Sequence, residues 1–85
     1  MTHQDFFRTF PAVAGDHLWQ LHDDEVQLEQ GDGRVTIRLG PERVRKIAGL
    51  SLPATQLEFE FSNQDQAQVT AFMARFDLSF RRGGG

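Results

Sequence analysis

Two alternating segments joined by a glycine-rich turn place the strongest restriction on how this chain can fold. Apolar and polar residues alternate over 25–30 and again over 34–39, as in strands that bury one face. Gly31-Asp32-Gly33 lies between them, and such a tripeptide is typical of a tight hairpin turn. The sequence therefore predicts an antiparallel hairpin whose buried face carries Val26, Leu28, Val35, Ile37 and Leu39.

Charge selects the register of this hairpin. A two-residue turn at Gly31-Asp32 places Glu29 opposite Arg34 and Glu25 opposite Arg38, and opposite charges facing each other across two strands are favourable. A turn one residue later keeps the same two faces but loses both ion pairs. We therefore predict the first register, which on the other face pairs Leu28 with Val35 and Val26 with Ile37.

Further strands are expected on both sides of the hairpin. Residues 56–61 alternate in the same way, and 18–21 form a short candidate strand that a turn at 22–24 joins to the hairpin. Residues 41–53 permit two interpretations. Pro41 suits the first position of a short helix ending at Gly49, whereas an extended conformation also fits. Pro53 is expected to interrupt regular structure.

Two helices are predicted at the ends of the chain. Thr2 and Asp5 form a capping box for the first helix, which is expected to end before Pro11. The second helix is predicted over 62–80 with Ser62 as its cap, and it carries an apolar stripe at three- and four-residue spacing. The stripe consists of Val69, Phe72, Met73, Phe76 and Phe80.

These elements predict an α+β fold. A three- to four-stranded antiparallel meander would carry the long C-terminal helix and the short N-terminal helix on one face. The 85 residues suffice for one small domain, expected over 1–80. Residues 81–85, Arg-Arg-Gly-Gly-Gly, are expected to form a flexible basic and glycine tail.

Composition excludes several classes of protein. The chain has no Cys, so disulfides, thiol catalysis and thiolate metal sites are excluded. It has no apolar run of 18 residues and no basic leader before an apolar segment, so we expect no membrane span and a cytoplasmic location. Eight Arg against one Lys is a bias common in bacterial proteins.

Catalytic and metal-binding patterns are lacking in the sequence. No nucleophile elbow, phosphate-binding loop, dinucleotide fingerprint or zinc-protease motif occurs. The three histidines, His3, His17 and His22, match no metal-ligand spacing. We therefore expect no enzymatic activity, no cofactor and no metal ion.

The leading functional hypothesis is a small non-enzymatic binding or accessory module. It would act through protein contacts, with an unknown partner or as a homodimer. The observation behind it is the number of aromatic residues, eight Phe and one Trp, which exceeds what one helix-on-sheet layer requires. The residues proposed for such a surface are Phe72, Phe76, Phe80, Arg81 and Arg82.

Two alternative functions remain open. The basic segment 34–46 resembles a phosphate or nucleic-acid binding surface, made by Arg34, Arg38, Arg43, Arg45 and Lys46. The hairpin acids compete for the first two cations and no aromatic residue interleaves with the cluster, so nucleic acid is disfavoured. The ending Gly83-Gly84-Gly85 is similar to that of sulfur carriers and ubiquitin-like modifiers, although the predicted order of elements departs from their β-grasp fold.

Overall fold

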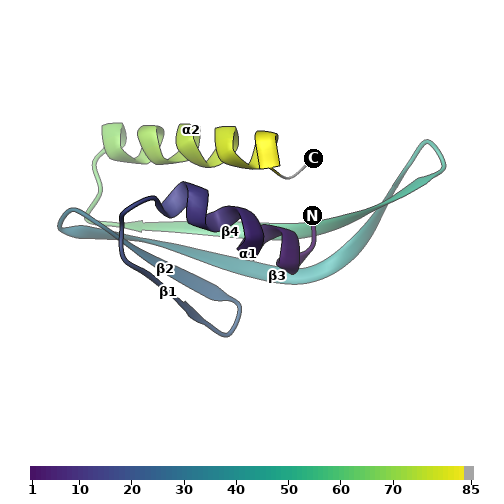
Figure 1. The fold of residues 1–85 in the computed structure, drawn as a ribbon, viewed down its shortest axis with the longest axis horizontal. Coiled ribbons are helices and arrows are strands. Elements are labelled where there is room, and N and C mark those ends of the chain that lie inside the picture. The colour runs from purple at the N-terminus through teal and green to yellow at the C-terminus, as the bar shows by residue number, and fades with distance from the viewer. Residues whose placement is uncertain (84–85) are drawn as a thin grey trace.

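The described residues form two helices and one four-stranded sheet. The computed structural model describes residues 1–83, with side chains through Arg81. Its elements are, in chain order, α1 (His3–Ala14), β1 (Trp19–His22), β2 (Glu25–Gln30), β3 (Gly33–Ile47), β4 (Leu50–Ser62) and α2 (Gln66–Gly83). The sheet order is β1-β2-β3-β4, and both helices lie on one face of the sheet (Figure 1). The predicted α+β meander is confirmed.

The hairpin of β2 and β3 has the register that charge predicts. Glu25 lies opposite Arg38 and Glu29 opposite Arg34, and Gln30 and Gly33 close the two-residue turn. Gly33 is buried where this turn meets the end of β4. A Cβ atom there would overlap the carbonyl oxygens of Ser62 and Asn63 and the side-chain amide of Gln64, so the position requires glycine.

Strands β3 and β4 extend much further than the alternating patterns alone indicate. The predicted short helix after Pro41 is wrong and the extended interpretation is right, because β3 continues to Ile47 and pairs with β4. Ala48 and Gly49 form the turn, both at positive φ (52° and 82°), as a two-residue hairpin requires. Pro53 does not interrupt β4, because β4 is an edge strand and needs hydrogen bonds on one side only.

A β-bulge divides β3 into two parts. Leu39 pairs with Leu57 and Glu42 with Thr55, so Gly40 and Pro41 together stand opposite the single residue Gln56. One extra residue shifts the side-chain alternation of β3 by one position. Leu39 therefore faces the helices, and so does Glu42 three residues later.

Helix α1 begins as predicted but ends later. The Thr2 hydroxyl accepts a hydrogen bond from the Asp5 backbone N–H at 3.0 Å, and the Asp5 carboxylate accepts one from the Thr2 N–H, completing the capping box. The helix passes through Pro11 to Ala14, so the predicted end before Pro11 is wrong. Val13 and Ala14 are buried in the core, and this burial favours the additional turn over the local cost of proline.

Helix α2 begins four residues later than predicted. Ser62 still belongs to β4, and Asp65 is the cap instead. The Asp65 carboxylate accepts a hydrogen bond from the Gln68 N–H at 2.8 Å, while the Gln68 side chain accepts one from the Asp65 N–H at 2.9 Å. The helix continues to Gly83, beyond the predicted end at residue 80. Gly84 and Gly85 lie outside the described residues.

The core lies between the sheet and the helix pair. Rings from α1, β4 and α2 pack against one another, with Phe6 stacked on Phe10 and Phe59 edge-on to Phe76 at 5.0 Å. Arg75 of α2 contacts both α1 and the sheet: its Nε donates to the Val13 carbonyl of α1 at 3.1 Å, and its Nη2 donates to the Gln30 side chain of β2 at 3.3 Å, which joins the helices to the sheet. The buried apolar residues are Phe6, Phe10, Val13, Ala14, Val26, Leu28, Val35, Ile37, Leu39, Phe72 and Phe76.

Candidate functional site: a projecting arm and an acidic cluster

The hairpin end of β3 and β4 projects beyond both helices (Figure 1). We call residues 42–55 the arm. Six residue pairs, from Glu42 with Thr55 to Ile47 with Leu50, give it a length of about 20 Å at roughly 3.4 Å per residue. It accounts for much of the longest dimension of the molecule, which measures 45 × 25 × 20 Å. Its residues 42–53 are all exposed.

Four large aliphatic side chains of the arm face solvent. Their exposed fractions are 66% for Val44, 49% for Ile47, 64% for Leu50 and 45% for Leu52. A two-stranded ribbon on its own is at best marginally stable in water, and clustered exposed apolar side chains are characteristic of interaction surfaces. The arm is therefore a candidate interaction surface.

The arm is also the basic part of an acidic chain. Arg43, Arg45 and Lys46 outnumber Glu42, giving the arm a net charge of +2. Since the whole chain has a net charge of −3, the remainder carries −5. The arm therefore favours a partner that offers both carboxylates and apolar area.

The pairing in the arm distributes cations and aliphatic residues over both of its faces. Arg43 pairs with Ala54, Arg45 with Leu52 and Ile47 with Leu50, so these six side chains share one face, continuous with the sheet face away from the helices. Val44 and Lys46 belong to the other face. Isolated ribbons twist strongly, and the arm can therefore present side chains from both faces to one partner.

The N-terminus fixes the base of the arm. The His3 ring Nε2 bonds the Gly40 carbonyl at 2.7 Å, and the His3 backbone N–H donates to the Glu42 carboxylate at 2.5 Å. The Thr55 hydroxyl donates to the Met1 carbonyl at 2.6 Å. These bonds tie both strands of the arm to the start of α1, so the arm leaves the body in a defined direction.

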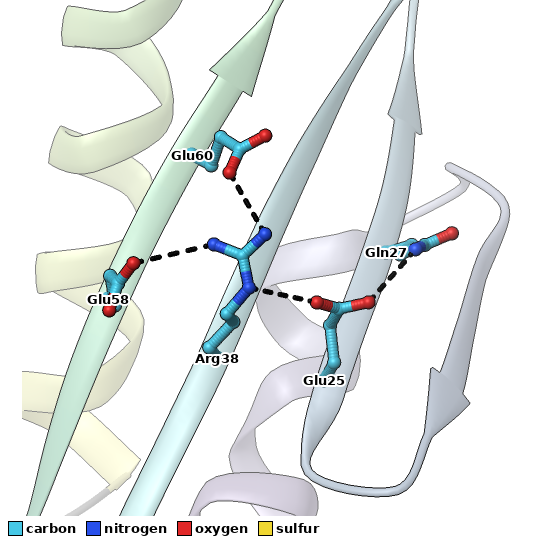
Figure 2. A network of polar contacts seen from close by, with 5 residues as sticks. All are labelled: Glu25, Gln27, Arg38, Glu58 and Glu60. Carbon is cyan, nitrogen blue, oxygen red and sulfur yellow. Dashed lines mark hydrogen bonds and ion pairs between the residues drawn. The ribbon is translucent and has the colours of Figure 1, made fainter.

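An acidic cluster lies on the open face of the sheet, next to the arm (Figure 2). Arg38 donates to Glu25 at 3.0 Å, to Glu60 at 2.9 Å and to Glu58 at 3.5 Å, and the Gln27 side chain donates to Glu25 at 3.1 Å. The hydrogen bond to Glu60, with the negative charges of Glu60 and Glu25, raises the pKa of Arg38 above its ordinary value. We call Arg38, Glu25, Glu58 and Glu60 the Arg38 cluster.

The Arg38 cluster retains excess negative charge. Three carboxylates surround one guanidinium group, so the net charge is −2. The side chains of Glu58 and Glu60 are 74% and 56% exposed, which leaves oxygen atoms available to further cations. This excess has the same magnitude as the positive charge of the arm and the opposite sign.

The structure separates the basic residues that the sequence groups together. Arg34 pairs with Glu29 at 3.1 Å, and Arg38 is held in its cluster, so both have carboxylate partners within the chain. Arg43, Arg45 and Lys46 lie beyond the bulge on the arm. The predicted basic segment 34–46 is therefore two surfaces, a neutralised one on the sheet and a cationic one on the arm.

The predicted aromatic surface on α2 is largely part of the core. Phe72 is fully buried and Phe76 is 6% exposed, so these two cannot serve as an exposed surface in this chain, and the prediction is corrected for them. Phe80 is partly buried and stacks on Phe76 at 4.3 Å. Arg81 is exposed, whereas the Arg82 side chain lies outside the described residues.

Sequence reasoning missed the aliphatic residues of the arm. The available signal was Ala48-Gly49, a possible turn between two segments of similar length, 42–47 and 50–55. It was masked because Val44, Ile47 and Ala48 also match helical spacing. Among the described residues, no three His, Asp or Glu side chains converge as metal ligands. Neither described helix is long and apolar enough to cross a lipid bilayer.

Comparison of the chain with protein-family models, with curated proteins and with solved structures gives no match.

Proposed function

We propose that this chain is a non-enzymatic module that binds a protein partner through its arm. The observation that carries the proposal is the presence of four aliphatic side chains, 45–66% exposed, on a ribbon that projects from the body. The partner surface would offer carboxylates that receive Arg43 and Arg45 and would cover the aliphatic side chains beside them. The absence of Cys and the preference for Arg over Lys support a bacterial cytoplasm as the setting.

Apolar burial supports a protein partner over a nucleic acid. Full burial of an aliphatic side chain contributes about 1.5–3 kcal/mol, so completing the burial of four half-exposed ones would contribute roughly 3–6 kcal/mol before the costs of association. A phosphate backbone would engage the three cations but leave most of this apolar area in water. A protein surface that carries carboxylates can engage both sets of side chains, because apolar atoms contribute about 55–60% of a folded protein's surface.

Site-specific photocrosslinking in the producing cells tests the proposal. A photoreactive residue at Leu52 probes the arm, and one at Leu78 on α2 is a matched control because the two side chains are 45% and 47% exposed. We expect a defined protein adduct from position 52 and none from position 78. Reversal of charge at Arg43 and Arg45 should remove the adduct.

Two results would contradict the proposal. Equal labelling from both positions would show that the arm has no preferred protein partner. Salt-sensitive binding of a labelled oligonucleotide, lost on Arg43→Glu/Arg45→Glu, would assign the arm to nucleic acid instead.

A further inference from the structure

We infer that the partner of the arm is a second copy of this chain, with each arm docked on the Arg38 cluster of the other copy around a two-fold axis. The inference rests on the proposed function and specifies its partner. It follows from three properties of the described residues: matched opposite charges, their symmetrical placement along β4, and the inability of one copy to bring them together.

Charge is the first property. The arm carries +2 and the Arg38 cluster −2, and both belong to the same chain. In a two-fold dimer every contact occurs twice, so one surface must contain both halves of the complement. Complementary charge also discriminates against dissimilar partners and accelerates encounter.

Position along β4 is the second property. Ala54 and Leu52, which pair with Arg43 and Arg45, lie two and four residues before Gln56. Glu58 and Glu60 lie two and four residues after it. A two-fold axis that passes at Gln56, opposite the bulge, therefore places Arg43 of one copy level with Glu58 of the other copy along the strands. It places Arg45 level with Glu60 in the same way.

Distance within one copy is the third property. The partners of Arg38 and Arg45 on β4, Glu58 and Leu52, lie six residues apart, which corresponds to about 20 Å along the ribbon. The arm and the cluster lie on opposite sides of the bulge along β3 and β4. An arm cannot fold back onto its own cluster while β3 and β4 remain paired, whereas a second copy in antiparallel orientation places the two in contact.

The expected dimer is weak. One side of the arm, about 20 Å long and roughly 10 Å wide, covers about 200 Å², so two arms and two receiving surfaces bury roughly 800 Å². Stable protein interfaces bury about 1,200–2,000 Å². Monomer and dimer should therefore exchange, with association that increases with protein concentration and decreases with ionic strength.

Charge-swap complementation, measured by sedimentation velocity on the full chain, tests reciprocal docking. The arm variant is Arg43→Glu/Arg45→Glu, and the cluster variant is Glu58→Arg/Glu60→Arg. Each variant alone places like charges in both contacts and should remain monomeric at concentrations where the wild type dimerises. An equimolar mixture restores opposite charges in both contacts and should sediment as a heterodimer.

A milder cluster variant with a single substitution keeps the test valid if the double cluster variant does not fold. Glu58→Arg alone keeps the shorter contacts of Arg38 to Glu25 and Glu60. This variant and the matching arm variant Arg43→Glu each leave one opposite-charge pair in every contact, so each alone should associate more weakly than the wild type, and their equimolar mixture should recover the wild-type association. Circular dichroism melting identifies which variants are folded.

Two results would overturn the inference. The first is a wild-type chain that remains monomeric at low salt and millimolar concentration. The second is a pair of folded variants that do not associate when mixed. In either case a different protein crosslinked from Leu52 would leave the proposed function intact. Absence of any adduct would remove both.

Discussion

Replacement of Phe72 by Leu tests whether the aromatic stripe of α2 belongs to the core. Phe72 is fully buried, with ring centroids 5.8 Å from Phe61, 6.2 Å from Phe76 and 6.3 Å from Phe59. Each aromatic pair contributes about 0.5–1.5 kcal/mol beyond its buried area, but leucine refills most of the space. We expect a loss of about 2 kcal/mol in the free energy of unfolding.

Thermal unfolding followed by circular dichroism measures this loss. For a domain of this size, 1 kcal/mol corresponds to roughly 4–8 °C in Tm, so Phe72→Leu should lower Tm by about 8–16 °C. Leu78→Ala on the same helix is the control, because Leu78 is 47% exposed and a surface change should cost no more than about 0.5 kcal/mol. Equal shifts for the two variants would refute the packing described for α2.

Three further changes have defined expected outcomes. Gly33→Ala places a Cβ against the Ser62 carbonyl and should cost about 1–3 kcal/mol by urea unfolding, and an unchanged midpoint would contradict the close approach. Ala48→Asn relieves a φ of 52° at the tip of the arm and should raise stability by roughly 0.5–1 kcal/mol, again by urea midpoint, whereas a lower midpoint would rule out this turn geometry. Hydrogen bonds from Thr2 lower the pKa of Asp5, so this carboxylate stabilises the fold above its unfolded pKa and loses that contribution as pH falls through the lowered value. Asp5→Asn should accordingly flatten the fall of Tm between about pH 5 and pH 2, and an unaltered profile would count against the capping box.

Local signals were sufficient for most of the fold. The register of β2 and β3 followed from two pairs of opposite charges, and the start of α1 followed from its capping box. The end of α1 could not be predicted in this way, because the cost of Pro11 is local whereas the burial of Val13 and Ala14 depends on the sheet beneath them. Tertiary burial therefore decided the boundary.

The arm was harder to predict from the sequence than the rest of the fold, for two reasons. The extra residue at Gly40-Pro41 breaks the alternation of 34–39, so the arm does not continue the pattern of the strand to which it belongs. Its exposure is also invisible locally, since it arises only because the helices do not cover the sheet beyond the bulge (Figure 1). From residue type alone, Leu50 and Leu52 would be predicted to lie in the core.

The same reasoning explains the misplaced aromatic surface. Phe72 and Phe76 repeat at helical spacing, and such a stripe is equally suited to a core or to a partner. Only the position of β4 beneath α2, with Phe59 against both rings, assigns them to the interior. The aromatic stripe of α2 is therefore used for packing, and the large apolar side chains exposed on the arm are aliphatic.

The bulge at Gly40-Pro41 makes the arm separately adjustable from the body. Deleting one of these two residues would restore simple alternation through β3 and leave Arg43 and Arg45 on the open face, because they would keep their partners on β4. The deletion would instead remove the local bend and the additional twist that a bulge introduces, and so change the direction in which the arm leaves the body, with the core contacts before Leu39 unchanged. A single-codon deletion at this position thus offers evolution, or a designer, a way to redirect the arm without repacking the core.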